Sequence, residues 1–399
     1  MDNIETQDVI ANLSARLNTL MEHHKTNTLD GTAPNGKYYR SFNQREATEM
    51  SGINHKKIND VCDRLGIKYK DGNKWVINHL DLIKLRAYKG YTPYKRPNKS
   101  PASVWVISIL KGGTGKTTVA VTLASGLSQQ LLEQYKVLLI DLDPQSTSTH
   151  YYYPLFDDSG ISICELMMQS KFDPEQESFE DHCLRAVNKT NIKTLDILCS
   201  RDSDRRYDLY VKQKELEANS KSAEYCSYTE LQKITEIMSK HYDIILIDTP
   251  PHFSAANLAA HYVANNLLIP IRPSENDWDS GVKYFSFLND MYSILSGLGH
   301  KGYENIKVLL SAQKSTSRPQ EHIAHKLRIG LGYDYLMANV LPESEAILTC
   351  AEMNSTTFDI SESEYMGTKK TLKKAQDDAL KVVHEFEGFV RSKFDSYDK

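Results

Sequence analysis

The sequence predicts an α/β fold, with a doubly wound, mostly parallel sheet that follows a small, mainly helical region. Three observations predict it. Short apolar runs alternate with segments of helical periodicity through residues 104–399. A glycine-rich loop separates the first apolar run from a helical pattern, and two later runs end directly in aspartate. Residues 1–103 are more basic and lack this alternation, so we expect them to form separate units.

A loop rich in glycine follows the apolar run at 104–110 and consists of Lys111, Gly112, Gly113, Thr114, Gly115, Lys116, Thr117 and Thr118. A strict Walker A loop has glycine where this chain has Leu110, and here a second lysine begins the loop instead. The glycines let consecutive N–H groups approach a phosphate, and the next helix adds a positive dipole end. Lys116 would reach the β and γ phosphates and Thr117 would ligate Mg²⁺. The alternative is a simple turn.

Two further motifs place carboxylates at strand ends. The run at 137–140 leads into Asp141 and Asp143, and the run at 244–247 leads into Asp248 in the manner of a Walker B segment. Ligands of open α/β sheets bind at the carboxyl ends of strands. An aspartate after a strand can also cap a helix or form a turn. The three motifs in this order favour a P-loop NTPase that uses ATP and Mg²⁺.

These motifs resemble those of the deviant Walker A ATPases of the ParA/MinD group, over residues 104–393. The resemblance implies that Lys111 reaches across a nucleotide-sandwich homodimer to the partner's ATP phosphates. It implies that Asp143 orients or activates the attacking water, so that Lys111, Lys116 and Asp143 are catalytic. Thr117, Asp141 and Asp248 would surround the magnesium ion. By the same resemblance, Pro270 and Arg272 would border the adenine.

The charge distribution points to a nucleic-acid partner. The 399 residues carry a formal net charge of −4, but residues 37–99 hold 15 basic and 6 acidic side chains. A small basic module therefore precedes an acidic ATPase domain. The six cysteines lack metal-ligand spacing and are typical of reduced cytosolic thiols. No signal peptide or long apolar span is evident, so we expect a cytoplasmic protein without membrane insertion.

Residues 1–30 are predicted to form a dimerisation helix. Apolar side chains recur at steps of three and four residues at Ile10, Leu13, Leu17 and Leu20. Packing of this helix on its own domain is the alternative, because the repeat is short.

Residues 37–88 are predicted to form a winged helix-turn-helix DNA-binding domain. We expect helices at 43–50 and 55–65, with Asn54 as the N-cap of the second. A hairpin at 68–76, turning at Asp71-Gly72, would form the wing. The predicted DNA contacts are Asn54, Lys56, Lys57, Asn59, Lys70 and Lys74. A basic protein-interaction module of the same shape is the alternative.

Residues 89–103 carry three prolines and are predicted to be an exposed, stiffened linker to the ATPase domain at 104–399. In that domain we expect further strands at 195–198, 267–271, 307–310 and 335–341, while 157–221 is left unassigned.

The apolar stripe of a final helix at 368–394 should pack on the sheet. The alternative is membrane binding, as in MinD-type relatives. The lysines at its start (Lys369, Lys370, Lys373 and Lys374) would contact DNA or form a solvated face.

The resemblance extends to the long ParA proteins of plasmid partition, which carry an N-terminal helix-turn-helix region. It implies a cytoplasmic, nucleoid-associated ATPase that dimerises with ATP and binds non-specific nucleoid DNA. A centromere-binding, ParB-type partner would stimulate hydrolysis. In the ADP state the protein would bind its operator and repress its own operon. A MinD-like positioning ATPase and a DNA-binding regulator with a vestigial nucleotide site are the alternatives.

Overall fold

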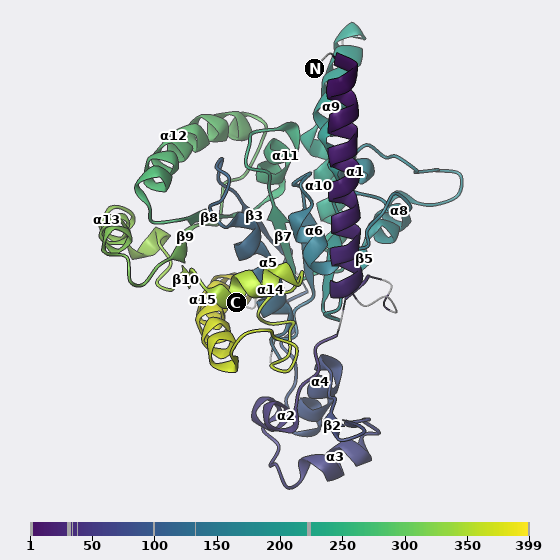
Figure 1. Cartoon of the computed structure of the whole chain (residues 1–399). Helices are drawn as coiled ribbons and strands as arrows, with labels where there is room; N and C mark the ends of the chain where they lie inside the picture. Colours follow the sequence, from purple (N-terminus) through teal and green to yellow (C-terminus); the bar gives the residue numbers. More distant parts are fainter. Residues whose placement is uncertain are drawn as a thin grey trace.

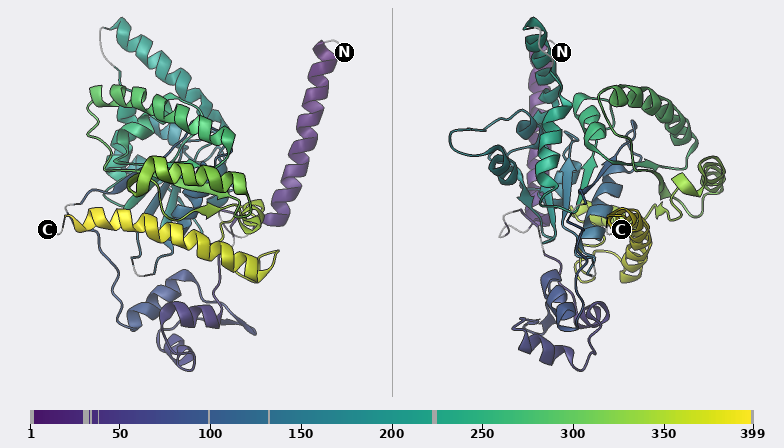
Figure 2. Two further views of the ribbon diagram at one scale, coloured as in Figure 1. Left: turned by 90° about the vertical axis from the view of Figure 1, so that its left-hand side faces the viewer. Right: turned by 180° about the vertical axis from the view of Figure 1, so that it is seen from behind.

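The computed structural model describes residues 3–29, 33, 35–37, 39–98, 100–131, 133–221 and 225–397. Figure 1 shows a long N-terminal helix, a small module below the main body, and a large α/β domain. The N-terminal helix is α1 (Asn3–Thr28), and it stands beside the body rather than within it, as Figure 2 shows from the side. Its apolar residues Val9, Ile10, Leu13, Leu17 and Leu20 are exposed. Dimerisation through this helix stays a prediction.

An eight-stranded sheet forms the centre of the large domain, in the order β10-β9-β8-β3-β7-β4-β6-β5. Only β5 pairs antiparallel within this described sheet, against β6. The strands are β3 (Ser103–Ile107), β4 (Val137–Asp141), β5 (Asn188–Lys189), β6 (Leu195–Leu198), β7 (Ile244–Asp248), β8 (Asn266–Ile271), β9 (Asn305–Gln313) and β10 (Leu341–Pro342). The predicted doubly wound, mostly parallel sheet of a P-loop NTPase is therefore confirmed.

Helices cover both faces of this sheet, so its strands are apolar on both sides (Figures 1 and 2). Val104 and Val106 of β3 face one core, whereas Trp105 and Ile107 face the other. The flanking helices are α5 (Lys116–Ser128), α6 (Thr147–Tyr152), α7 (Ile163–Met167), α8 (Phe179–Ala186), the 3₁₀ helix η1 (Asp202–Arg206), α9 (Tyr207–Ser220), α10 (Tyr228–Met238), α11 (Ala255–Val263), α12 (Glu275–Gly297), α13 (Arg318–Tyr335), α14 (Glu345–Glu352) and α15 (Lys369–Asp395).

The C-terminal helix α15 packs on the sheet, as its apolar periodicity predicted. Thr368 caps its start by accepting a hydrogen bond from the backbone N–H of Thr371. Phe386 is fully buried, with its ring centroid 4.4 Å from that of Trp105 on β3. The apolar stripe is thus already covered by the protein core. Across the described part of the chain, every helix is too short or too polar to span a bilayer.

The small module has its own apolar core, formed by two short helices, a hairpin and a third helix. Its elements are α2 (Gln44–Ser51), α3 (Ile58–Arg64), β1 (Lys70–Asp71), β2 (Lys74–Trp75) and α4 (His79–Tyr88). This order agrees with the expected helix, turn, helix and hairpin. Helix α2 begins at the Asn43 capping box and ends at Gly52, whose φ of 69° suits glycine.

Two details of the module differ from the prediction. Asn54 is not the N-cap of α3, because its side chain accepts the Lys56 N–H at 2.9 Å and opens a turn before the helix. The hairpin register pairs Asp71 with Lys74, so the two-residue turn is Gly72-Asn73 rather than Asp71-Gly72. Gly72 has a φ of 59°, a conformation that glycine adopts without strain. Both differences shift a boundary without changing an element.

The expected strand at 335–341 is wrong. Helix α13 continues to Tyr335, Leu336 forms a single bridge with Val308, and β10 has only two residues. The backbone N–H groups of Ala338 and Asn339 donate instead to the Glu385 carboxylate on α15, at 2.6 and 2.8 Å. These N–H groups are therefore unavailable to a neighbouring strand.

The linker is also less exposed than predicted, because its second half packs on the large domain. The Arg96 guanidinium donates to the carbonyl oxygens of Tyr242 and Ser239, both at 2.9 Å, and lies 3.5 Å from the Asp243 carboxylate. The Tyr94 ring stacks on Phe394 of α15. These contacts fix the path of the chain just before β3.

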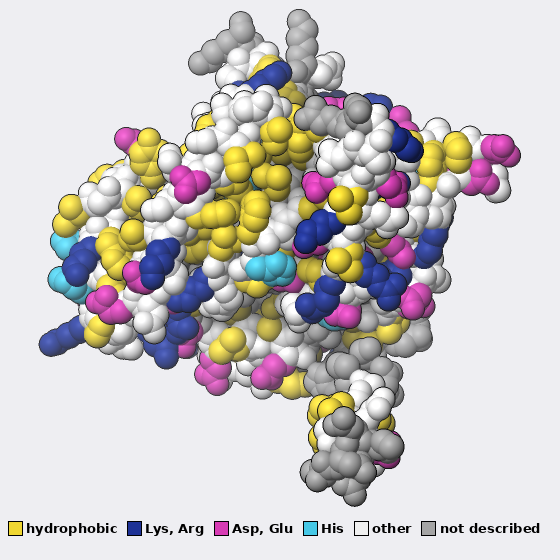
Figure 3. Space-filling view, turned by 90° about the horizontal axis from the view of Figure 1, so that it is seen from above, with side chains coloured by type: hydrophobic (Ala, Val, Ile, Leu, Met, Phe, Trp, Pro, Cys, Tyr) yellow, Lys and Arg dark blue, Asp and Glu magenta, His cyan; other side chains and the backbone are white. Residues whose placement is uncertain are grey.

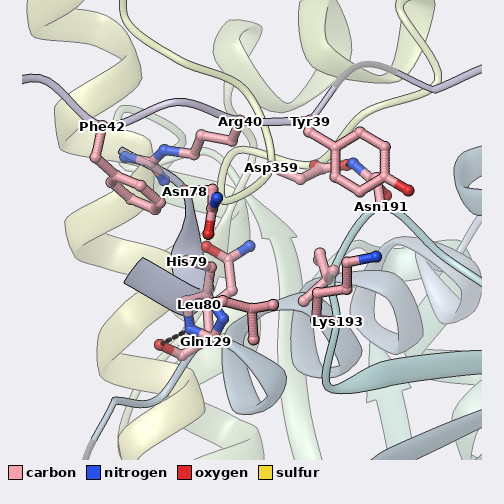
Figure 4. A pocket seen from close by; sticks show the side chains of 11 residues that line it. Tyr39, Arg40, Phe42, Asn78, His79, Leu80, Gln129, Asn191, Lys193 and Asp359 are labelled. Atoms are coloured by element: carbon pink, nitrogen blue, oxygen red, sulfur yellow. Dashed lines mark hydrogen bonds between the residues drawn. The ribbon is translucent and has the colours of Figure 1, made fainter. Parts of the chain in front are cut away.

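A buried contact joins the module to the large domain. The Lys37 ammonium lies 3.7 Å from the Asp359 carboxylate, and both side chains are almost fully buried. Arg40 donates to the Phe358 carbonyl oxygen at 2.6 Å. Figure 4 shows the adjacent cavity of about 160 Å³, where the His79 ring from the module meets the Gln129 carbonyl oxygen. The two parts therefore share a polar, partly enclosed interface.

Candidate nucleotide-binding site

The glycine-rich loop lies between the end of β3 and the start of α5. Gly113 and Gly115 have φ values of 76° and 86°, which side chains with a Cβ rarely adopt. Gly115 caps α5, and the Thr114 carbonyl oxygen accepts a hydrogen bond from the Ser311 hydroxyl at 2.7 Å. The first N–H groups of a helix have no partner within the helix, so the start of α5 favours an anion at this loop.

Lys116 curls back over the loop. Its ammonium donates to the Lys111 carbonyl oxygen at 2.8 Å, and the side chain is largely buried. Burial lowers the pKa of Lys116, while the nearby charges of Asp248 and Asp143 act to raise it. The predicted phosphate-binding lysine is therefore held at the loop and next to the two acidic motifs.

Asp141 and Asp248 are side by side at the ends of β4 and β7, and both are fully buried. Asp141 accepts hydrogen bonds from both the N–H and the hydroxyl of Thr149, each at 2.8 Å, and from the Asp143 N–H at 3.1 Å. Burial raises the pKa of both carboxyls, and for Asp141 the neighbouring Asp248 charge raises it further. A positive ion at this position would relieve that cost.

The residues present suit a magnesium ion beside Asp248. Its Oδ2 accepts the Ser148 hydroxyl at 2.7 Å, whereas its buried Oδ1 has no hydrogen-bond partner among the described residues. The nearby Thr117 hydroxyl acts to lower the pKa of Asp248. Mg²⁺ prefers such oxygen ligands. Both oxygens of Asp141 are already engaged, so the geometry favours Asp248 and Thr117 as the direct ligands.

Asp143 lies on the loop after β4 and is only partly buried. Its Oδ1 accepts the Gln145 N–H at 2.9 Å, and no described residue donates a hydrogen bond to its second carboxylate oxygen. The charge of Asp143 acts to raise the pKa of Lys116. The three predicted catalytic or metal aspartates therefore meet the phosphate loop at one edge of the sheet.

Lys111 is held within its own chain. Its ammonium lies 2.5 Å from the Asp277 carboxylate and donates to the Asn276 carbonyl oxygen at 2.8 Å, both in the first turn of α12. The side chain remains partly exposed. Sequence reasoning did not find Asp277, because it follows Lys111 by more than 160 residues.

Pro270 and Arg272 lie at the far side of the loop. Pro270 is buried in β8, and Arg272 pairs with Glu343 at 2.9 Å just beyond β10. No described contact joins Arg272 to the phosphate loop. An adenine contact by these residues stays a prediction.

The sequence reading missed the hydroxyls that support the acidic residues. Ser148 and Thr149 bond to Asp248 and Asp141, and Ser200, after β6, bonds to the loop of Asp143. A signal was present for the first two, because they open a helix just after the first aspartate motif. Ser200 lies within residues 157–221, which were left unassigned, so only the fold reveals its role.

The molecular surface at this end of the sheet is partly apolar. Figure 3 views the molecule from this end and shows apolar side chains gathered across its centre. Two large apolar residues near the site, Phe253 after β7 and Val282 on α12, are 47% and 52% exposed. An exposed apolar patch of this kind is typical of an interaction surface.

Comparison with known proteins agrees with the motifs and the fold. A family model described as an AAA domain matches residues 102–291. The chain is 24% identical over 325 residues to plasmid partition protein A of Escherichia coli, covering 80% of each chain. It is also 24% identical over 240 residues to protein SopA of Escherichia coli K12, covering 59% of this chain and 58% of SopA.

Solved structures show the same fold. One described as a partition protein has a TM-score of 0.65 at 19% identity and covers 96% of this chain and 99% of its own. A Cyanothece McdA–ATP complex has a TM-score of 0.53 at 22% identity, covering 70% of this chain and 96% of McdA. The chain is thus similar in sequence and in fold to ParA-type plasmid partition ATPases, and it shares with them a glycine-rich loop that begins with a lysine.

Proposed function

We propose that this protein is an Mg²⁺-dependent ATPase that segregates DNA as a nucleotide-driven switch. The observation that carries this proposal is the meeting of Lys116, Thr117, Asp143 and Asp248 at one end of three adjacent strands. McdA, which has a similar fold, was solved as a complex with ATP, and this supports nucleotide binding by the present chain. A slow ATPase that is stimulated by a centromere-binding partner fits a switch better than a metabolic enzyme.

Each residue of the site has a separate task in the proposed hydrolysis. The loop N–H groups and Lys116 bind the β and γ phosphates and offset their charge. Thr117 and Asp248 would hold Mg²⁺, which neutralises charge that develops between these phosphates. Asp143 orients the attacking water with its free carboxylate oxygen. The buried Asp141 carboxylate accepts a hydrogen bond from the Asp143 N–H and so holds the Asp143 loop.

The proposed active species is a homodimer in which the two ATPase domains close on each other when ATP binds. The Lys111 ammonium would leave Asp277 and the Asn276 carbonyl oxygen and would bind the phosphates of the partner's ATP. It would then act in the way of an arginine finger, but with the compact charge of a lysine. The apolar surface with Phe253 and Val282 lies at the same end and would be covered in such a dimer. Helix α1 would supply a second contact between protomers.

The module at residues 37–88 is proposed to bind operator DNA. Its candidate contacts Lys56, Lys57, Lys70 and Lys74 are all exposed, as is Asn54. Asn59 is partly buried and accepts a hydrogen bond from Gln44 at 3.2 Å, so it would need to change partners to contact a base. ADP would favour operator binding and self-repression, whereas ATP would favour non-specific nucleoid DNA.

One pair of experiments tests this proposal. Lys116→Ala should abolish ATP turnover, whereas the exposed control Lys283→Ala on α12 should leave it unchanged. Asp143→Ala should retain nucleotide binding but lose turnover. Equal turnover in this variant and the natural chain would support a vestigial site instead.

The second experiment measures binding to operator and random duplexes with ADP or ATP. The protein should prefer the operator duplex with ADP and the random duplex with ATP. Random-DNA affinity should fall with salt, with a log–log slope of about 0.9 per phosphate neutralised.

A further inference from the structure

The loop that carries Asp143 is held from a strand that sequence reasoning did not connect with the site. Ser200 follows β6 and is almost fully buried. Its hydroxyl donates to the Asp143 carbonyl oxygen at 2.6 Å, and that oxygen also accepts the Ser146 N–H at 2.8 Å. The backbone of Asp143 is thus held on its carbonyl side by two donors.

The other side of Asp143 is held through the same serine by an indirect route. The Ser200 N–H donates to the Thr149 hydroxyl at 2.9 Å, and that hydroxyl donates to Asp141 Oδ2 at 2.8 Å. Asp141 Oδ1 in turn accepts the Asp143 N–H. Ser200 therefore closes a ring of hydrogen bonds that contains both the N–H and the carbonyl of Asp143.

We propose that Ser200 is a positioning residue for ATP hydrolysis, which fixes Asp143 so that its free carboxylate oxygen meets the attacking water. This inference rests on the proposed role of Asp143. The ring lies in a buried part of the site, where water cannot readily replace a lost hydrogen bond. Ser200 lies outside the phosphate loop and bonds to none of the residues proposed to hold ATP, so its removal should affect the chemical step and spare binding.

The test uses the purified full chain and the variant Ser200→Ala. We expect kcat to fall at least about tenfold, because a displacement near 1 Å can cost that much or more. The KM for Mg-ATP and the affinity for a fluorescent ATP analogue should stay within about twofold of the natural chain. The matched control is Thr190→Val, which removes another buried hydroxyl near the opposite end of β6, where it bonds to the Leu195 carbonyl oxygen. That variant should keep its kcat.

A double variant separates positioning from a general structural effect. If Ser200 acts through Asp143, adding Ser200→Ala to Asp143→Ala should cause no further loss of turnover. Independent, additive losses would overturn the inference, as would an unchanged kcat in Ser200→Ala when Asp143→Ala is inactive. Full activity of Asp143→Ala would instead refute the role of Asp143 itself, on which the inference rests.

A second substitution covers the case in which Ser200→Ala fails to fold, as judged by circular dichroism. Ser200→Cys has a similar size but a weaker donor, so its kcat should lie between those of the natural chain and an inactive site. A kcat equal to that of the natural chain in this folded variant would overturn the inference.

Discussion

At the scale of single residues, the site depends on carboxylates that the fold buries beside hydroxyl groups. Asp141 and Asp248 each accept a hydrogen bond from a hydroxyl group at the start of α6, and this bond lowers the free-energy cost of burying their charge. The aspartates were predictable because they end apolar strands. The supporting hydroxyls follow the first aspartate motif in the sequence, but which aspartate each one reaches depends on how α6 packs.

The buried carboxyl of Asp204, which lies outside the proposed metal site, gives the protein a stability that should depend on pH. It accepts the Ser162 hydroxyl at 2.6 Å, and burial raises its pKa to about 6. Because the folded pKa exceeds the unfolded one, the contribution of Asp204 to stability is greatest at low pH and is lost as the pH rises from about 4 to about 6. The stability of the natural chain relative to Asp204→Asn should fall by about 3 kcal/mol over that range.

Urea unfolding at several pH values measures this difference. The exposed variant Asp202→Asn serves as the control and should follow the natural chain throughout. A difference between the natural chain and Asp204→Asn that does not change with pH would contradict the prediction.

At the scale of elements, α15 shows how a sequence pattern can have two meanings. An amphipathic helix with lysines at its start suits either a membrane surface or a protein core. In the structure its apolar stripe meets α5 and the sheet, with Phe386 against Trp105. The stripe is therefore not available to lipid in this fold, which argues against a MinD-like function.

Phe386→Ala should destabilise the large domain by about 3–5 kcal/mol, because it leaves a cavity against Trp105. Lys374→Ala on the exposed face of the same helix should change stability by no more than about 0.5 kcal/mol. Denaturant unfolding followed by tryptophan fluorescence checks both values. ATP-dependent pelleting of the natural chain with anionic vesicles would contradict the core role of α15.

At the scale of the whole molecule, the module is fastened to the ATPase domain by a buried ion pair. Burial lowers the pKa of Lys37, and the Asp359 carboxylate opposes that shift. Asp359→Ala would leave the ammonium buried without its partner, so it should cost about 3–5 kcal/mol. Asp279→Ala, which breaks the exposed pair with Lys283, should cost no more than about 1 kcal/mol.

Unfolding titrations give these two costs, and limited proteolysis near residue 37 reports release of the module. In the double variant Lys37→Met/Asp359→Leu, much of the stability should return, because neither charge remains buried. Equal costs for the buried and the exposed pair would contradict the proposed fastening.

Self-association of α1 is the second prediction for the whole molecule. Leu13→Asp with Leu17→Asp should abolish nucleotide-independent dimers, because charge would enter the predicted apolar contact. Ser14→Asp places the same charge on a polar position of the helix and should keep the dimer. Light scattering after size-exclusion chromatography measures the mass of each. A natural chain that is monomeric without nucleotide would refute this role of α1.

The sequence alone determined the parts of this protein that depend on short, local patterns. Strand-end aspartates, the lysine-first glycine loop and the periodicity of α15 each lie within a few neighbouring residues, so the sheet and the meeting of these motifs in the candidate nucleotide site were predictable. The linker path and the 335–341 segment were not, because Arg96 and the Glu385 carboxylate bind groups far away in the chain. Only the tertiary structure could pair Lys111 with Asp277, Lys37 with Asp359, and Ser200 with Asp143. Such contacts depend on how whole elements pack, and no local pattern encodes them.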